Sequence, residues 1–366
     1  MTLRWRNPIS SLPFAEPIAN TLDQEFAAQS LRRRAQALRK AAFRELMLLT
    51  NGQSRRRVER VPMTVRSMIW IYTWTTVGDA IMDLAPRVLV PRRIEIDLLI
   101  APALAPLFAT DRRLRAVHVH PDALPVDVDF ILLDAFRTTS LRLKAERYPQ
   151  LPFASMRGHN AGEQFDRVAF ADRRIRQLFD LPLDEVVAPT LDLGESGARV
   201  FDQERFRIAL PLGARVARMR YGHWKETLQR IVSGWPEHVA PPLFRFLGHG
   251  GSARDDLATI GSEFVAAHGE AELDSGDLRK GAFDVADCDA FLGVDGGLMH
   301  VAVGVGTPGL ALFAGIDPVL RLRPGGTMLA LTTHGKVSDL DAVTVAAAFL
   351  QALPGFANNR RGEVSS

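Results

Sequence analysis

Short apolar segments alternate with helical segments along most of the chain, and this alternation limits the possible folds more than any other feature. A first series contains predicted strands at residues 68–72, 94–100, 116–119, 130–133 and 168–170, and a helix at 103–113. A second series contains predicted strands at residues 207–210, 243–247, 290–294 and 310–313, and helices at 224–232, 253–267 and 338–353. Apolar strands separated by helices indicate an α/β fold built on parallel sheets.

The length of the chain and the break between the two series indicate two domains. A chain of 366 residues is too long for one ordinary domain. The break falls near residues 182–200, which contain two prolines and two glycines. We predict Rossmann-like domains at 67–195 and 196–354 that face each other across a cleft, where such folds bind ligands. A flexible polar tail is predicted at 355–366.

Residues 1–66 are predicted to form a basic helical extension before the first domain. They hold 13 of the basic residues and 5 of the acidic ones, so the rest of the chain is net acidic. Apolar residues recur at helical spacing from Leu22 to Leu49, with a capping-box pattern at Thr21 and a stop signal at Asn51-Gly52. The helix either docks on an anionic surface such as membrane lipid or packs on the body, the commoner outcome for such runs.

Composition and motif content exclude several classes of protein. A single cysteine, Cys288, excludes a disulfide framework and a cysteine-built zinc site, and it favours a reducing, cytoplasmic setting. The first residues have no apolar core of a secretory signal. The uncharged stretch at 296–316 contains a proline and six glycines, so we predict loops and a buried strand there and no membrane span. No metal-binding, Ser-hydrolase or dinucleotide motif is present.

Residues 75–80, Thr-Thr-Val-Gly-Asp-Ala, follow a predicted strand and open a predicted helix. Gly78 allows close approach of the backbone to a ligand, and the helix N-terminus can receive a polar or anionic group. Asp79 is placed to point into the cleft, where its carboxylate can take a proton from an attacking hydroxyl. Aspartate is also a common N-cap residue, and the residues alone favour that interpretation.

Residues 295–300, Asp-Gly-Gly-Leu-Met-His, follow the predicted strand at 290–294. Asp295 ends the strand, and Gly296 and Gly297 expose backbone N–H groups before a short helix, an arrangement that suits a diphosphate. Taken alone, His300 is more simply explained as a buried, hydrogen-bonded core histidine.

Three arginines, Arg215, Arg218 and Arg220, lie between the strand at 207–210 and the helix at 224–232. Guanidinium groups are well suited to phosphate. A solvated basic loop explains the same pattern equally well.

The segment from Asp287 to Pro324 resembles the donor-binding segment of glycosyltransferase family 9, the heptosyltransferases. That family has an aspartate, a small hydroxyl residue, a glycine, two spacers and a histidine, then a Gly-Thr-Pro turn, a strand and an Asp-Pro. The matching residues here are Asp295, Gly297, His300, Ala302, Gly306, Thr307, Pro308, Leu312, Phe313, Asp317 and Pro318. Residues 77–82 are similar to the family's Gly-Asp element after the first strand.

The resemblance implies a two-domain GT-B fold and an inverting, metal-independent transferase without a cofactor. A nucleotide sugar is the implied donor, with ADP-heptose expected, and lipopolysaccharide or another surface glycan is the implied acceptor. Asp79 then matches the general base, with Gly78 beside it on the acceptor side. Asp295 matches the residue that holds the donor sugar hydroxyls, and Gly296, Gly297 and His300 match the loop at the donor diphosphate.

The basic position that neutralises the leaving diphosphate, usually a lysine in the family, is approximated by Arg218 or Arg220. Gly296 stands where the family has Ser or Thr, and residues 1–66 have no counterpart in the family. A catalytically silent, nucleotide-sugar-binding or scaffold protein is therefore the alternative. We expect peripheral contact with the inner face of the membrane through the basic extension, and no nucleic acid partner.

Overall fold

The computed structural model describes residues 29–159, 165–194, 205–274, 276–323 and 325–360. The chain divides into two compact units, Met1–Pro189 and Thr190–Ser366. The border predicted at residue 195, the capping-box pattern at Thr21 and the end of the predicted tail lie outside the described residues.

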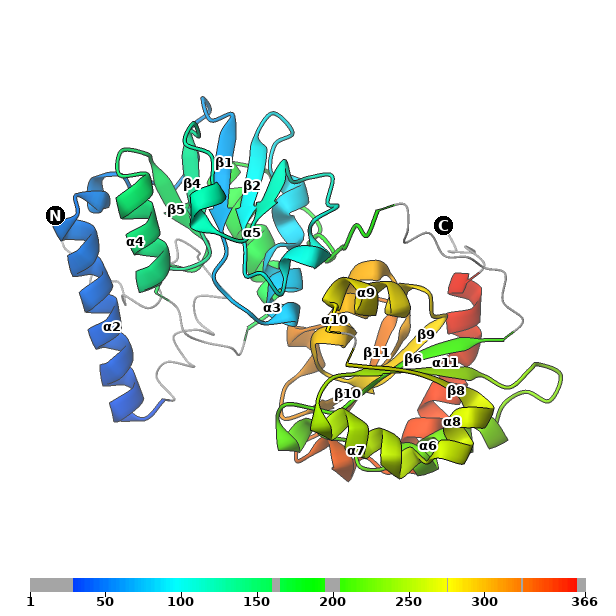
Figure 1. Ribbon diagram of the computed structural model, residues 1–366. Helices are drawn as coiled ribbons and strands as arrows, with labels where there is room; N and C mark the ends of the chain where they lie inside the picture. The colour runs from blue at the N-terminus through cyan, green and yellow to red at the C-terminus, as the bar shows by residue number, and fades with distance from the viewer. Residues whose placement is uncertain (1–28, 160–164, 195–204, 275, 324, 361–366) are drawn as a thin grey trace. The chain divides into compact units, whose positions relative to one another are not determined.

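Unit 1 contains a parallel sheet with the strand order β3-β2-β1-β4-β5. Its strands are β1 (Ser67–Ile71), β2 (Glu95–Leu99), β3 (Ala116–His118), β4 (Phe130–Leu133) and β5 (Phe153–Ser155). Its α-helices are α2 (Leu31–Thr50), α3 (Val77–Asp83), α4 (Thr138–Arg147) and α5 (Arg167–Phe179) (Figure 1). The order reverses between β1 and β4, so the carboxyl ends of these two strands form the usual ligand position of such a sheet.

Two predictions in unit 1 are wrong. The helix expected at 103–113 is only a short 3-10 turn, Ala105–Leu107, because Pro106 lacks an N–H group and disfavours helix in the residue before it. The strand expected at 168–170 lies inside α5. Asp166 caps that helix by accepting a hydrogen bond from the Ala169 N–H at 2.9 Å.

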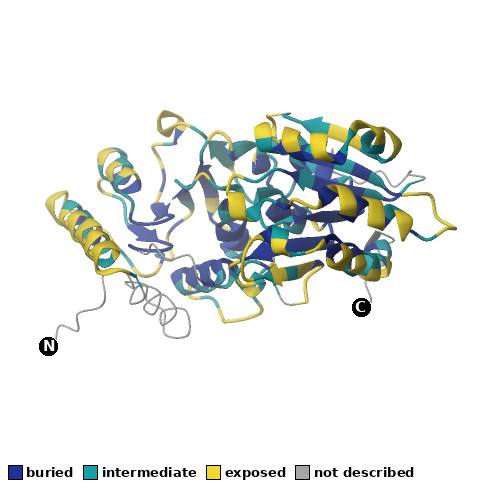
Figure 2. Ribbon diagram, turned by 90° about the horizontal axis from the view of Figure 1, so that it is seen from below, coloured by how far each residue is buried: buried dark blue, intermediate teal, exposed yellow. Residues whose placement is uncertain are grey.

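The helix of the N-terminal extension packs on unit 1 with one face and exposes another. Helix α2 lies beside α4, buries Ala41 and Leu48, and is dominated by exposed residues over the rest of its surface (Figures 1 and 2). It ends at the predicted stop, where Gly52 adopts a φ of 67°. Packing on the body is thus confirmed for the inner face.

Unit 2 contains a second parallel sheet, with the order β11-β10-β9-β6-β7-β8. Its strands are β6 (Arg207–Leu212), β7 (Leu243–Gly248), β8 (Gly269–Leu273), β9 (Ala290–Val294), β10 (Gly309–Ala314) and β11 (Met328–Thr333). Its α-helices are α6 (Trp224–Ser233), α7 (Gly251–Ile260), α8 (Ser262–His268), α9 (Leu278–Ala286), α10 (Gly297–Val305) and α11 (Ala342–Arg360). The order reverses between β6 and β9, as in a dinucleotide-binding domain.

The predicted helix at 253–267 is interrupted in the structure. Gly261 has a φ of 97°, which is not a helical conformation, and it separates α7 from α8. This backbone conformation is unfavourable for residues other than glycine. The last helix, α11, is capped by Asp341, whose Oδ1 accepts from the Thr344 N–H at 2.8 Å. It continues past the predicted end at 353 as far as Arg360. Strands β8 and β11 and helix α9 were not predicted.

Candidate active site

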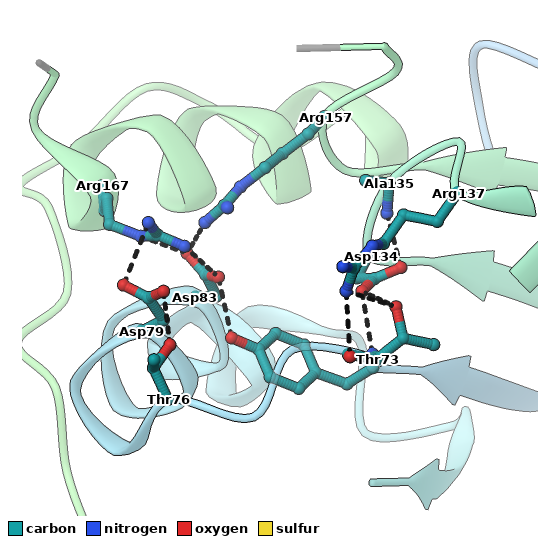
Figure 3. Close-up of polar contacts among 10 residues, drawn as sticks. Thr73, Thr76, Asp79, Asp83, Asp134, Ala135, Arg137, Arg157 and Arg167 are labelled. Atoms are coloured by element: carbon teal, nitrogen blue, oxygen red, sulfur yellow. Dashed lines mark hydrogen bonds and ion pairs between the residues drawn. The ribbon is translucent and has the colours of Figure 1, made fainter. Parts of the chain in front are cut away.

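In unit 1, the residues that follow β1 and β4 are joined by a buried carboxylate. Asp134 Oδ2 accepts hydrogen bonds from Thr73 N at 2.8 Å and Thr73 Oγ1 at 2.6 Å. Its Oδ1 accepts from Ala135 N at 2.7 Å and Ser140 Oγ at 3.2 Å (Figure 3). Burial raises the pKa of Asp134. This aspartate therefore fixes the two strand ends at the point where the strand order reverses.

Asp79 occupies the first turn of α3, at the carboxyl end of β1. Thr76 is the N-cap residue of this helix, so the alternative that Asp79 is itself the cap is wrong. The hydroxyl of Thr76 donates to Asp79 Oδ2 at 2.5 Å, and Arg167 Nη1 lies 3.0 Å from Oδ1 (Figure 3). The Asp79 side chain is 23% exposed, so its carboxylate is both oriented and accessible. Gly78, the preceding residue, is half-buried.

A buried ionic network that the sequence did not predict supports Asp79. Arg167 is 3% exposed and also reaches Asp83 Oδ2, at 2.9 Å from its Nη2. Asp83 is buried as well, and it accepts hydrogen bonds from Arg157 and, at 3.0 Å, from the Tyr72 hydroxyl (Figure 3). Asp83 follows Asp79 by four residues on the same face of α3, and this spacing was the available signal.

In unit 2, the predicted donor loop lies at the reversal point of the sheet. Asp295 follows β9, and its N–H donates to the carbonyl of Leu312 in β10 at 2.9 Å. Gly296 is the N-cap residue of α10 and has extended backbone with a φ of −179°. No side chain of the described residues caps this helix, so the N–H groups of its first turn are directed at the carboxyl edge of the sheet.

His300 lies on α10, one turn after Gly296 and Gly297. Its side chain is buried, and its Nε2 lies 3.8 Å from Asp295 Oδ1. The histidine thus lies beneath the donor loop and beside its carboxylate.

The two predicted arginines differ in their surroundings. Arg220 lies 2.7 Å from Asp256 Oδ1, so a carboxylate already balances its charge. Arg218 is exposed and makes no ion pair with any residue that the structure describes. Its guanidinium group lies against Gly315, the residue after β10. Arg218 is therefore the better placed of the two to meet an anion at this edge of the sheet.

A pocket of about 310 Å³ adjoins the donor loop. It lies at the carboxyl ends of β7 and β8 and the start of α9, and Leu298 of α10 forms the wall shared with the donor loop. Its lining residues are Leu247, Gly248, His249, Glu272, Gly276, Asp277, Leu278, Gly281, Asp284 and Leu298. This pocket was not predicted from the sequence, although Gly248 and Gly250 around His249, after a predicted strand, were a signal for a ligand loop.

Within the described ranges, no group of three or more His, Cys, Asp or Glu side chains is arranged to hold a metal ion. Among the same residues, no helix is both long and apolar enough to cross a bilayer.

Comparison with known proteins identifies the segment that contains the donor loop. Residues 278–327 match the model of glycosyltransferase family 9 (heptosyltransferase). This segment is therefore similar to the heptosyltransferases of that family. The matched segment contains α9, β9, α10 and β10, and therefore Asp295, Gly296, Gly297 and His300. No curated protein sequence matches the chain at a significant level.

Solved structures share the fold of this chain. A family 9 glycosyl transferase from Veillonella parvula has a TM-score of 0.61 and 12% identity, and the match covers 80% of this chain and 99% of that one. The ADP-heptose lipopolysaccharide heptosyltransferase II of E. coli has a TM-score of 0.60 and 17% identity, with coverages of 81% and 99%. E. coli heptosyltransferase WaaC, solved with ADP, has a TM-score of 0.57 and 15% identity, with coverages of 80% and 99%.

Proposed function

We propose that this protein transfers heptose from ADP-heptose to a hydroxyl of lipopolysaccharide or another surface glycan, with inversion at the sugar carbon and without a metal ion. The observation that carries the proposal is the loop Asp295–His300, which begins at the strand reversal of unit 2 inside the segment that matches the family. Similar folds have been solved with ADP and with ADP-2-deoxy-2-fluoro heptose, and this supports the choice of donor.

On the donor side, each part of the nucleotide sugar has a matching group in unit 2. The Asp295 carboxylate accepts hydrogen bonds from sugar hydroxyls. The first-turn N–H groups of α10 and the Arg218 guanidinium neutralise the diphosphate as negative charge develops on it. The nucleoside enters the adjoining pocket, where Leu278 and Leu298 offer apolar contact to the base and Asp277 offers a carboxylate for ribose hydroxyls.

On the acceptor side, Asp79 of unit 1 acts as the general base. The acceptor hydroxyl loses its proton to the carboxylate while its oxygen forms a bond to the anomeric carbon. The bond from that carbon to the diphosphate breaks at the same time, and ADP leaves with the electron pair. Thr76 and Arg167 each hold one Asp79 oxygen, and we assign to them the role of orienting the carboxylate.

The test of this assignment is Asp79→Asn, followed by ADP release with donor and acceptor present. We expect turnover to fall by about 10²–10⁴-fold, the usual contribution of a general base, while donor binding changes less than about twofold. Asp122→Asn is the control, because that side chain is 99% exposed in the same unit. Unchanged turnover in Asp79→Asn removes the base assignment.

A second function is favoured by one specific observation. Gly296 has no hydroxyl to offer the donor phosphate, so the chain can be a catalytically silent protein that binds a nucleotide sugar or acts as a scaffold. This alternative requires saturable donor binding without transfer to any acceptor. Release of ADP that depends on an added glycan acceptor contradicts it.

We further propose that the chain works at the inner face of a membrane, through the outer face of α2. Four leucines at helical spacing are exposed there, Leu31, Leu38, Leu46 and Leu49. Arg32 and Arg39 flank this stripe and are exposed too, a combination suited to anionic lipid. We expect the chain to co-sediment with vesicles containing phosphatidylglycerol but less with pure phosphatidylcholine, and the double variant Leu38→Ser/Leu46→Ser to lose this binding. Equal sedimentation of the variant contradicts the assignment.

A further inference from the structure

Arg137 is a half-buried cation at the carboxyl end of β4. Within the described residues, no carboxylate lies at ion-pair distance from its guanidinium group. Its guanidinium carbon lies 4.6 Å from the centre of the Trp74 ring, and its Nη1 donates to the Thr73 carbonyl at 2.9 Å. Asp134 interacts electrostatically with Arg137, but its carboxylate oxygens accept hydrogen bonds from Thr73, Ala135 and Ser140. Arg137 is therefore held firmly, while most of its N–H donors make no hydrogen bond with the side chains and backbone that the structure describes.

Arg44 on α2 is a second cation of this kind. It is half-buried, and its Nε is fully buried without a hydrogen-bond partner among the described residues. Burial and the positive charge of Arg137 lower the pKa of Arg44, so the two guanidinium groups interact electrostatically. Two desolvated like charges repel each other, and a buried donor without an acceptor costs stability.

Neighbouring contacts place α2 against the residues beside Arg137. Glu45, the residue after Arg44, lies 3.0 Å from Arg57 Nη1, and the Arg57 guanidinium carbon lies 5.6 Å from the ring centre of Phe136. Glu45 also lies 2.8 Å from His159 Nε2. The nearest acidic group on α2 is thus engaged by Arg57 and His159 and does not compensate Arg44 or Arg137.

We propose that Arg44 and Arg137 form a subsite for an oxyanion, a phosphate ester or a sugar carboxylate, carried by the acceptor glycan. The proposal rests on the proposed function. Guanidinium groups bind such anions through paired N–H donors, and an incoming anion would relieve the repulsion between the two cations.

The subsite lies beside the candidate base. Arg137 and Arg167 both lie over the Trp74 ring, and the Arg167 guanidinium carbon is 5.7 Å from the ring centre. Arg167 Nη1 in turn lies 3.0 Å from Asp79 Oδ1. An anionic group bound at Arg137 would therefore position a neighbouring hydroxyl of the same glycan toward Asp79. Helix α2, which lies outside the segment matched by the family, thus takes part in acceptor recognition.

The experiment titrates the full chain with glucose 6-phosphate, glucuronate and glucose, and measures binding by calorimetry at low salt. We expect saturable binding of at least one of the two acids and none of glucose, and the stronger of the two acids identifies the anion. Arg44→Gln and Arg137→Gln should each weaken that binding about tenfold, as expected for the loss of a charge-assisted hydrogen bond. Arg142→Gln on α4 is the matched control, because that side chain is exposed.

A thermal unfolding measurement on the same variants separates binding from a structural role. Arg44→Gln should keep or raise the melting temperature, because it removes a desolvated charge without a partner. Anion binding that neither substitution changes overturns the inference. So does an Arg44→Gln variant in which the melting temperature falls together with anion binding.

The outcome is distinct from that of the proposed function. Transfer that proceeds with an unchanged KM for an anionic acceptor in Arg44→Gln contradicts the subsite and leaves the transferase intact. If the parent chain never releases ADP but the variants lose anion binding, the result supports the subsite and contradicts the transferase.

Discussion

Gly296 is the residue at which the donor loop departs most clearly from the family pattern. Its backbone is extended, and a Cβ atom there would have the Val294 carbonyl oxygen as its nearest neighbour, at 3.8 Å. A serine therefore fits without strain, and its hydroxyl would cap α10 and donate to the diphosphate.

We expect Gly296→Ser to bind ADP about fivefold more tightly, a change that corresponds to a net hydrogen bond of about 1 kcal/mol. Gly296→Ala is the control, because it adds the Cβ atom without the hydroxyl. Calorimetric titration with ADP measures both variants. Serine binding no better than alanine would show that the hydroxyl has no role at this position.

Lys144 gives unit 1 a pH-dependent stability. Its ammonium group is buried, donates to Gln53 Oε1 and lies 4.8 Å from the Phe153 ring centre. Burial lowers its pKa to about 8 from 10.5 in the unfolded chain. Between these values the unfolded chain binds more protons than the folded one, so stability rises with pH through this window.

We therefore expect the unfolding free energy to increase from pH 8 to pH 10 by up to about 1.4 kcal/mol per pH unit through this group. In Lys144→Met this contribution should be absent. Urea unfolding of both proteins across the pH range measures the difference. A variant with the same pH slope as the parent would contradict the assigned pKa.

Individual site residues were predictable from the sequence where they follow the end of a strand. Residues that reach the site only through tertiary contacts were less predictable. Asp79 and Asp295 follow strands that the apolar pattern predicts, and parallel strands place their carboxyl ends at one edge of the sheet. Arg167 was not predictable as the partner of Asp79, because the two residues are 88 positions apart in the sequence. The wrong prediction of a strand at 168–170 also obscured that Arg167 begins helix α5.

At the scale of elements, the turn after β6 depends on one glycine. Gly213 has a φ of 77°, and a Cβ atom there would lie 2.8 Å from both the Ala253 backbone nitrogen and Ser252 Oγ. Helix α7 therefore approaches β6 more closely than any side chain at this position permits. The same approach lets Asp256 of α7 accept from the Gly213 N–H at 2.8 Å.

We expect Gly213→Ala to destabilise the chain by about 2 kcal/mol or more, through strain at positive φ and the contact with α7. Gly251→Ala in the same helix is the matched control. A Cβ atom there meets nothing within 4 Å, and alanine favours helix by up to about 1 kcal/mol. Denaturant midpoints of the two variants measure the effect, and equal midpoints would exclude a close-packed turn.

Burial explains several of the predicted elements but not all, because the half-buried strand β3 was predicted and the fully buried strand β5 was missed. The central strands β1, β4, β6 and β9 are apolar and carry a clear sequence signal. The edge strands β8 and β11 have mostly half-buried or exposed residues, so their sequences, Gly-Glu-Ala-Glu-Leu and Met-Leu-Ala-Leu-Thr-Thr, lack that signal. The pocket beside the donor loop was missed for the same reason, because β8 and α9 form much of it.

At the scale of the molecule, two parallel sheets with a reversal of strand order each provide one half of the proposed chemistry. Unit 1 carries the oriented carboxylate of Asp79, and unit 2 carries the donor loop with its adjoining pocket. The alternation of strands and helices predicted both sheets, because a parallel sheet requires a crossover between successive strands. The function attributed to the whole chain depends first on donor binding by unit 2.

The most direct measurement is calorimetric titration of the full chain with ADP-heptose, ADP, UDP and GDP. We predict saturable binding of ADP-heptose and ADP, with UDP and GDP at least about tenfold weaker. Asp295→Ala should weaken ADP-heptose about tenfold and leave ADP within about twofold, because its carboxylate holds the sugar and not the nucleotide. Glu237→Ala, an exposed acid of unit 2, is the control. Absence of nucleotide binding, or an Asp295→Ala variant that binds ADP-heptose as the parent does, would contradict the account.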